Sequence, residues 1–182
     1  WALLYAQAEA LRRETALGVV FCLVPDFLRA TDRHYGFMLQ GLSETATRLN
    51  ARGIPFFLLR GDPGKEIPRF VAQSRAGLVV TDMDPLRIKQ GWQQQVARTR
   101  SCRVVEVDAH NVVPCRFVSQ KEEFAARTIR PKINRQRPRF LVKMPRLRRH
   151  PVTWSAQADV APVGETLMEQ ADLRGWTVYP WT

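Results

Sequence analysis

The residues best suited to chemistry lie where predicted strands end. The stretch EVDAHNVVPC (106–115) brings Asp108, His110 and Asn111 together directly after an apolar run. A carboxylate, an imidazole and an amide this close could form a catalytic cluster, line a ligand pocket, or satisfy the hydrogen bonds of a loop. An Asp–His pair acts as a base toward a nucleophile, and the sequence indicates none nearby. His110 by itself therefore fits a hydrogen-bonded loop residue better than a general base.

Polar residues also follow three other apolar runs of the chain. In open α/β sheets, ligands bind beyond the carboxyl ends of the strands, where free amides of helix N-termini can hold an anion or a heterocycle edge. We therefore expect a pocket at this edge. We call its ten candidate residues the rim: Pro25, Asp26, Gly61, Asp62, Asp82, Met83, Asp84, Asp108, His110 and Asn111.

Several catalytic motifs are missing from the sequence. No GxGxxG follows a strand, no GxSxG elbow occurs, and GDPGKE at 61–66 lacks the frame of a phosphate loop. The histidines lie far apart and the cysteines show no CxxC spacing, so we expect neither a metal site nor a disulfide framework. The residues alone predict a pocket-bearing domain with no catalytic residues.

Four continuous apolar runs alternate with stretches of helical spacing. The runs lie at 17–24, 54–61, 77–82 and 103–108, and their Val, Phe and Leu content predicts strands buried on both faces. Such alternation is typical of a parallel sheet with helices on both sides. We therefore predict an α/β fold: a Rossmann-like, doubly wound parallel sheet in three α/β/α layers.

Local signals mark the ends of the intervening helices. Apolar residues recur three and four positions apart from Tyr35 to Leu49, and Gly53 is placed to stop that helix. Asp62 and Asp84 each precede a proline, a pairing that predicts a capped helix start.

The chain begins within a helix, with Leu4, Ala8 and Leu11 on one face and no strand before it. The first strand of a doubly wound sheet is usually central. We therefore expect that strand to lie upstream of residue 1, and the α/β domain at 1–130 to be part of a longer protein.

Basic residues are concentrated in one segment. The chain has 28 Lys and Arg against 17 Asp and Glu, a formal net charge of +11, and ten of the bases but no acid lie at 127–149. Such a segment attracts polyanions by counterion release, although a solvated helix facing an acidic neighbour has the same composition. The candidate DNA contacts are Arg127, Arg130, Lys132 and Arg135.

Residues 131–182 contain repeated prolines and predict a basic, Pro-rich carboxyl-terminal linker. The part at 151–160 has too little periodicity to anchor a core. With 45% hydrophobic residues the chain can form one core. No apolar run is long enough to span a membrane and no signal pattern opens the chain, so we expect a cytoplasmic monomer without membrane contact.

Seven segments in order from Trp1 to about Phe140 form a recognisable series. They are WALLYAQ (1–7), FCLVPDFLRAT (21–31), RHYGFMLQGL (33–42), LRGDPG (59–64), VVTDMDPLR (79–87), VDAHNVVPC (107–115) and ARTIRPKI (126–133). Together they resemble the amino-terminal antenna domain of class II cyclobutane pyrimidine dimer DNA photolyases.

The resemblance implies a two-domain flavoprotein that repairs UV-damaged DNA. An α/β domain that can hold an antenna pigment, often a deazaflavin or a folate, precedes a helical domain that binds FAD and the flipped-out dimer. In that family, light excites reduced FAD, an electron passes to the dimer, the cyclobutane ring splits and the electron returns. The FAD-binding helical domain is absent here, so we expect it as a missing partner and expect this fragment alone to be inactive.

Two residues depart from the family pattern at or beside the rim. Asp84 stands where many relatives have Ser, and Arg116 where a Trp is familiar, so the electrostatics of antenna binding are altered. One alternative is a cryptochrome-like blue-light receptor domain without repair activity. Another is a stand-alone nucleotide-binding α/β protein.

Overall fold

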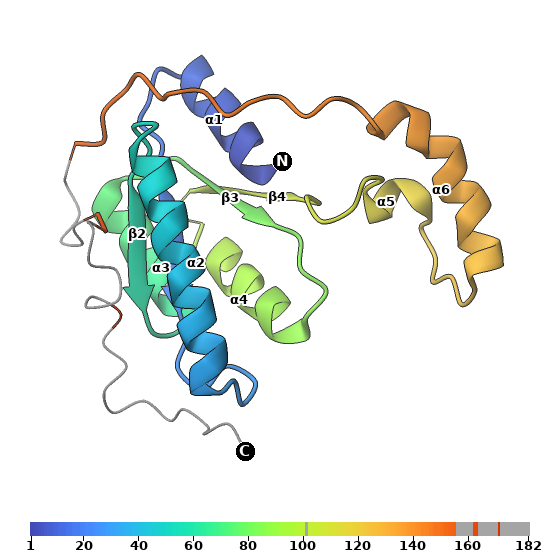
Figure 1. The fold of residues 1–182 in the computed structure, drawn as a ribbon, viewed down its shortest axis with the longest axis horizontal. Helices are drawn as coiled ribbons and strands as arrows, with labels where there is room; N and C mark the ends of the chain where they lie inside the picture. The colour runs from blue at the N-terminus through green and yellow to red at the C-terminus, as the bar shows by residue number, and fades with distance from the viewer. Residues whose placement is uncertain (101, 156–161, 164–170, 172–182) are drawn as a thin grey trace.

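The computed structural model describes residues 1–100, 102–155, 162–163 and 171 (Figure 1). In chain order, its elements are α1 (Ala2–Arg12), β1 (Val19–Leu23), α2 (Asp32–Asn50), β2 (Phe56–Arg60), α3 (Pro63–Ser74), β3 (Leu78–Asp82), α4 (Arg87–Arg98), β4 (Arg103–Val107), α5 (Cys115–Val118) and α6 (Ala126–Phe140). Each strand lies within its predicted run. Much of the expected linker, at 156–161, 164–170 and 172–182, lies outside the described residues.

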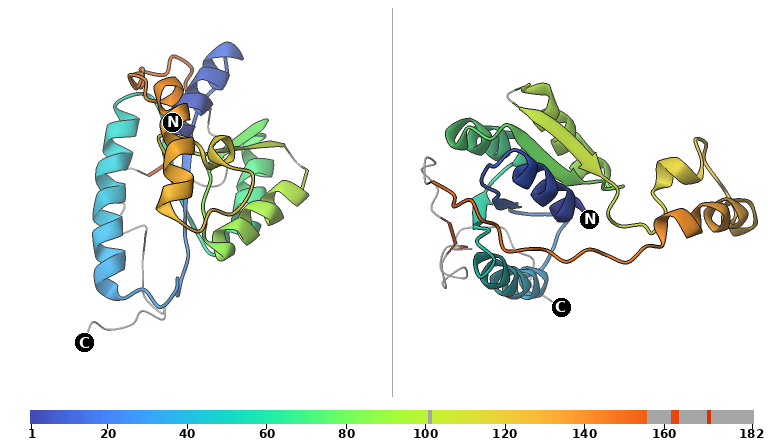
Figure 2. Two further views of the ribbon diagram at one scale, coloured as in Figure 1. Left: turned by 90° about the vertical axis from the view of Figure 1, so that its right-hand side faces the viewer. Right: turned by 90° about the horizontal axis from the view of Figure 1, so that it is seen from above.

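Helices cover both faces of the strands, which gives the three layers that the sequence predicts (Figure 2). On one face, Leu39 of α2 and Ala10 of α1 share a core with Phe56 of β2. On the other face, Phe70 of α3 packs against Phe57, the next residue of β2. Neighbouring residues of a strand point to opposite faces, so this one strand contributes to both cores.

The strands form two parallel pairs, whereas one sheet was predicted. β1 pairs with β2 from Val19 opposite Phe56, and β3 pairs with β4 from Leu78 opposite Arg103. A continuous sheet needs neighbouring strands about 4.7–4.9 Å apart. No described strand lies between β1 and β3 to connect the pairs, and each of these strands therefore keeps one edge without a strand partner.

α1 turns a different face to the core than its apolar pattern predicts. Leu4, Ala8 and Leu11 form the apolar face named above, but the buried residues are Gln7 and Ala10, and Ala8 is exposed. Because Gln7, a polar residue, lies at the centre of the buried face, the spacing of apolar residues does not predict that face. Gln7 is accommodated because both its amide nitrogen and its amide oxygen are hydrogen-bonded to a distant segment.

That distant segment is the strap, which we define as residues 147–154. The side chain of Gln7 donates to Arg148 O at 2.8 Å and accepts from Arg148 N–H at 2.9 Å. Trp154 packs on Phe57 with ring centroids 5.1 Å apart. The expectation that this region cannot anchor a core is therefore wrong. Its contacts come from single residues, which leave no periodic signal.

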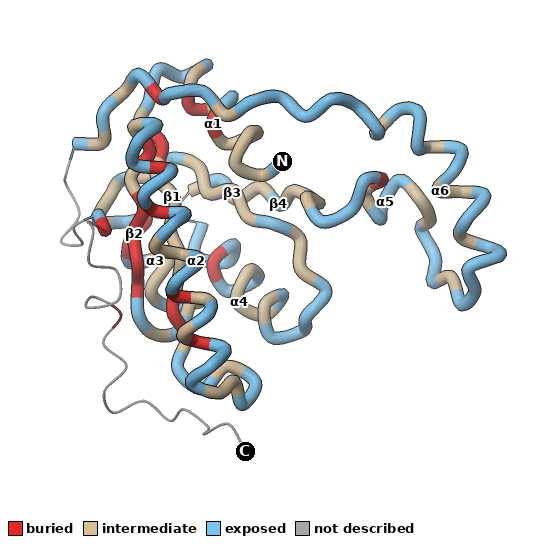
Figure 3. The backbone as a smooth tube through the Cα atoms, in the orientation of Figure 1, coloured by how far each residue is buried: buried red, intermediate tan, exposed pale blue. Residues whose placement is uncertain are grey.

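α5 and α6 stand apart from the strands in Figure 1 and in the right-hand view of Figure 2, and we call residues 115–146 the basic arm. α6 has no buried residue and packs on α5. Figure 3 shows the arm as almost entirely exposed or half-buried. Across the described residues, no helix combines the length and apolar content needed to cross a membrane.

Candidate functional site

The rim residues lie at the carboxyl ends of the strands in two groups. Gly61 N–H donates to the last residue of β1 at 3.0 Å, which places Pro25 and Asp26 near Gly61 and Asp62. Met83 N–H donates to the last residue of β4 at 2.8 Å and draws the ends of β3 and β4 together. The structure thus assembles the predicted residues as one group for each strand pair, not as a single cluster.

The loop after β1 is fixed by Tyr35 of α2. The Tyr35 hydroxyl donates to Val24 O at 2.7 Å and accepts from Phe27 N–H at 3.1 Å. Such bonds hold a backbone that departs from the usual regions. Three non-glycine residues of this loop have a positive φ: Asp26, Leu28 and Arg29. Conformations of this kind cost about 1–3 kcal/mol each and are frequent at ligand sites.

Asp62 caps α3, as predicted. Its carboxylate accepts from Gly64 N–H at 2.7 Å, and Pro63 occupies the first helical position. Gly64 also lies against α4, because an added Cβ there would come within 1.7 Å of Gln95 Oε1. The Asp62 carboxylate is therefore committed to the helix start, at a point where α3 and α4 are in close contact.

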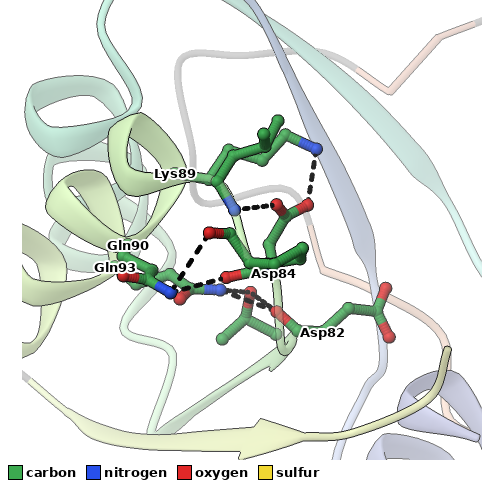
Figure 4. A network of polar contacts seen from close by, with 8 residues as sticks. Asp82, Asp84, Lys89, Gln90 and Gln93 are labelled. Atoms are coloured by element: carbon green, nitrogen blue, oxygen red, sulfur yellow. Dashed lines mark hydrogen bonds and ion pairs between the residues drawn. The ribbon is translucent and has the colours of Figure 1, made fainter. Parts of the chain in front are cut away.

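Asp84 forms the centre of a polar network after β3 (Figure 4). Its carboxylate accepts from Lys89 Nζ at 2.7 Å and from Leu86 N–H at 2.9 Å. The Lys89 hydrogen bond lowers the pKa of Asp84, against the opposing effect of partial burial, and the nearby His110 acts in the same direction. The predicted cap is wrong by two residues: α4 begins at Arg87, because the Leu86 N–H that Asp84 binds lies just outside the helix.

Two glutamines of α4 hold the backbone of the same turn. Gln93 Nε2 donates to Asp82 O at 2.6 Å, and Gln90 Nε2 donates to Asp84 O at 3.1 Å. The carboxylate of Asp82 points away from this network (Figure 4). Sequence reasoning missed Lys89, Gln90 and Gln93. Their spacing of three and four in the helix after β3 is the signal that could have identified them.

Asp108 and Asn111 shape the loop that leads to α5. One Asp108 carboxylate oxygen accepts from Cys115 N–H at 2.7 Å, and the other accepts from Asn111 Nδ2 at 2.9 Å. Burial opposes ionisation of Asp108, but these hydrogen bonds outweigh it and lower the pKa of this carboxyl. Burial and the nearby Asp108 charge raise the pKa of the Cys115 thiol. Cys115 is therefore not an activated nucleophile.

His110 is exposed and forms no hydrogen bond with Asp108 in the part of the chain that the structure describes. Of the three roles open to the cluster at 108–111, the geometry supports the hydrogen-bonded loop. No catalytic dyad is present among these residues.

Two cavities of the described structure lie away from the rim. One of about 320 Å³ lies between α5 and α6 and is lined in part by Arg116, Phe117 and Lys132. One of about 360 Å³ lies beside Gly53 and His150 of the strap. No rim residue lines either of these two cavities.

The candidate DNA contacts differ in what they already bind. Lys132 pairs with Glu123, whose pKa is lowered to about 2 by Lys132 first and by the Ser119 hydroxyl second. Arg127, Arg130 and Arg135 are exposed, and they form no ion pair with any described residue. Three of the four predicted contacts are therefore available to an external anion, and Lys132 serves the arm itself.

The chain is similar to proteins of one family. A family model described as DNA photolyase matches residues 1–151. A deoxyribodipyrimidine photo-lyase of Potorous tridactylus is 47% identical over 161 residues, which are 87% of this chain and 30% of that protein. One of Arabidopsis thaliana is 43% identical over 161 residues, 87% of this chain and 32% of that protein. The chain spans about a third of the length of these relatives.

A solved structure shares the fold. The crystal structure of a Synechocystis sp. PCC6803 cryptochrome matches with a TM-score of 0.64 over 86% of this chain and 35% of that chain. The sequence identity is 13%, so this similarity concerns the α/β fold alone.

Proposed function

Because the chain belongs to the DNA photolyase family, we propose that it is the amino-terminal α/β domain of a light-dependent deoxyribodipyrimidine photo-lyase. The family match over most of the chain, together with relatives of that name, carries the proposal. The substrate is a cyclobutane pyrimidine dimer in UV-damaged DNA. The seven segments quoted above favour class II within the family.

FAD is assigned to the helical domain that lies outside this chain. The sequence lacks a dinucleotide-binding motif, because no glycine-rich loop follows a strand. When bound in that domain, FAD supplies the electron that opens the cyclobutane ring. This domain packs against it and contributes no catalytic residue.

We place an antenna pigment, a deazaflavin or a folate, at the rim. The support is the position of the rim beyond the carboxyl ends of parallel strands, where such folds bind ligands. Neither of the two cavities given above lies at the rim, and the carboxylates of Asp62, Asp84 and Asp108 are already hydrogen-bonded within the chain. We therefore derive no energy-transfer step through it.

We assign DNA contact to Arg127, Arg130 and Arg135. Their side chains are exposed on α6, a helix without an acidic residue, and they can release counterions from phosphates. Lys132 contributes by holding Glu123, which keeps a carboxylate away from the approaching phosphates. A binding titration at several salt concentrations tests this assignment.

We also assign the full-length protein to the cytoplasm as a monomer. Light scattering during size-exclusion chromatography tests its mass, and a dimer at micromolar concentration would contradict the assignment. Fractionation of the source cells tests its location.

The deciding experiment uses the full-length natural protein, purified in the dark. We expect a flavin absorption spectrum and a light-dependent loss of dimers from irradiated DNA, with no loss in the dark. A band beyond that of flavin reports the antenna pigment. Flavin without repair would move the protein to the cryptochrome-like receptors. A protein without flavin would leave the nucleotide-binding alternative, which titration with adenine nucleotides would then test.

A further inference from the structure

One of the two cavities lies between the strap and the turn that follows α2. Its volume is about 360 Å³, and its described lining consists of Gly53, Arg149, His150, Pro151 and Thr153. Sites for small molecules have volumes of about 300–1,000 Å³, so this cavity admits one small ligand or one group of a larger ligand. No residue of the rim or of α6 belongs to that lining. The cavity is therefore separate from both.

Backbone contacts hold the strap against this turn. His150 N–H donates to Arg52 O at 2.7 Å, directly before Gly53. Gly53 has a φ of 70°, and a Cβ added there would lie 2.8 Å from His150 O. Leu147, at the other end of the strap, packs against the core. Arg149 therefore extends from a backbone that is already positioned, which lowers the cost of ordering it around a ligand.

The described lining of the cavity includes a basic residue and no acidic one. Arg149 is exposed, and it forms no ion pair with any described residue. Arg148 precedes it in the strap, and Arg52 adjoins the cavity through its hydrogen bond with His150. A recess surrounded by charge of one sign concentrates ions of the opposite sign. The ligand class that fits this cavity is an anion.

The donors at the cavity match a phosphate group. A guanidinium binds phosphate through two parallel N–H···O bonds, and Thr153 adds an exposed hydroxyl that can donate another. A carboxylate has two oxygens, which the guanidinium of Arg149 would occupy, whereas a phosphate group keeps a further oxygen for Thr153. Pro151 supplies apolar surface for the group that carries the phosphate.

His150 is an independent indication of a ligand. The residue is 4% exposed, Nε2 lies 2.8 Å from Thr15 O, and Nδ1 has no hydrogen-bond partner in the described structure. Because a carbonyl oxygen only accepts hydrogen bonds, Nε2 carries a proton and Nδ1 is left without a partner. Most buried polar atoms are hydrogen-bonded. This exception belongs to a residue that lines the cavity.

We propose that this cavity binds a phosphate group through Arg149 and Thr153. The phosphate has two possible sources: a small phosphorylated compound, or the backbone of a nucleic acid that lies across the strap. The contacts with Arg149 and Thr153 are the same in both cases, and only the group that packs on Pro151 differs. The proposal does not rest on the repair function.

Titration of the full-length natural protein with inorganic phosphate tests the proposal, with the ionic strength held constant by chloride. We expect calorimetry to show saturable binding that Arg149→Gln weakens by at least about 10-fold, because the variant loses the charge-assisted hydrogen bonds. Arg146→Gln is the matched control. Arg146 is exposed just before the strap but does not line the cavity, so its loss should change the affinity by less than about 2-fold.

A second pair of variants separates hydrogen bonding from charge. Arg149→Lys keeps the positive charge but loses the planar fork, so we expect it to bind phosphate more weakly than the natural protein. Thr153→Ala should also weaken binding, by less than Arg149→Gln does. Thermal unfolding in the absence of phosphate checks that each variant is folded.

Two results would overturn the proposal. Equal weakening by Arg149→Gln and Arg146→Gln would show that the affinity follows net charge and not the cavity. A lack of saturable binding at tens of millimolar phosphate would show that the cavity does not hold this group.

Competition with undamaged duplex DNA identifies the source of the phosphate. If DNA displaces phosphate from the site that Arg149→Gln removes, and the same variant weakens DNA binding, the ligand is a nucleic acid backbone. If DNA leaves the phosphate affinity of that site unchanged, the ligand is a small phosphorylated compound. None of these measurements involves light or flavin, so their outcome is separate from that of the repair assay.

Discussion

β2 and the basic arm use apolar side chains in opposite ways. In β2, Phe57 is 1% exposed and packs on Phe70 and Trp154 with ring centroids 4.9 and 5.1 Å apart. In the arm, Phe124 is 90% exposed and Leu141 is 65% exposed. β2 gathers partners from distant parts of the chain, whereas the arm is held by contacts between near neighbours.

This difference between β2 and the basic arm indicates which region contributes most to the free energy of unfolding. Burial contributes about 25 cal/mol for each Å² of apolar surface, while an exposed ion pair contributes about 0–1 kcal/mol. The arm relies on contacts such as the Lys132–Glu123 pair and Arg139, whose guanidinium lies 5.1 Å from the Phe117 ring centroid. Changes in the arm should therefore affect binding, and changes around β2 should affect folding.

The largest effect is expected at the centre of β2. Phe57→Ala removes a buried ring from the contact with Phe70 and Trp154, and should lower the free energy of unfolding by about 3–5 kcal/mol. Chemical denaturation of the variant measures this. The matched control is Phe124→Ala, which removes the same atoms from an exposed position and should stay within about 0.5 kcal/mol of the parent. Equal losses in the two variants would contradict the comparison.

The strap provides the next test. Gly53 has φ of 70°, and an added Cβ would lie 2.8 Å from His150 O. Gly53→Ala should therefore destabilise the protein by more than about 1 kcal/mol, because both the backbone and the strap must move. Gly77→Ala is the control, since no atom lies within 4 Å of the added Cβ. Gly77→Ala should leave the thermal midpoint of unfolding unchanged or slightly higher. A similar loss of stability in both variants would show that the effect at Gly53 does not come from its contact with the strap.

Replacing the three free arginines of α6 tests the other side of the comparison. Arg127→Ala, Arg130→Ala and Arg135→Ala together should leave the unfolding transition nearly unchanged. The salt dependence of DNA binding should fall by about 0.9 in log–log slope for each phosphate that the variant no longer neutralises. A control variant removes the same charge at Arg12 and Arg13, where α1 ends, and at Arg48 of α2. If it weakens DNA binding equally, net charge and not the arm is responsible.

The smallest effect is expected from acid. The pKa of Glu123 is lowered from 4.5 to about 2, chiefly by the hydrogen bond from Lys132. The stabilisation from this lowered pKa is thus fully present above pH 4.5 and is lost as the pH falls toward about 2. Carboxyl NMR titration measures the midpoint directly. Lys132→Met should return it toward 4.5, and an unshifted midpoint in the variant would exclude Lys132 as the cause.

The parts of the fold that sequence predicted are those encoded by neighbouring residues. The strands follow from continuous apolar runs. The cap of α3 follows from the pair Asp62 and Pro63, which directly precedes Gly64. The contact of Gln7 with Arg148 joins residues 141 positions apart, and no pattern in the sequence near either residue predicts it. The division into two strand pairs could not be predicted either, because an apolar run indicates that its own strand is buried but not which strand pairs with it.

The candidate site shows the same limit. Sequence placed Asp108 and Asn111 at a strand end but left three roles open, because residue type does not reveal which donor each oxygen will meet. The structure assigns both Asp108 oxygens to donors within the same loop. Lys89 escaped notice because its role depends on how the turn before α4 folds back toward the helix.

The strap gives the basic arm a second attachment. The arm leaves the strands after Val107 and is fastened again where Arg148 meets Gln7. Because the basic arm is attached to the α/β core at both of its ends, it can rotate about the line between the two attachments but cannot separate from the core. A single protease cut inside the arm would therefore yield two fragments in denaturing gels that still migrate as one particle in native gels, joined through the seated Trp154.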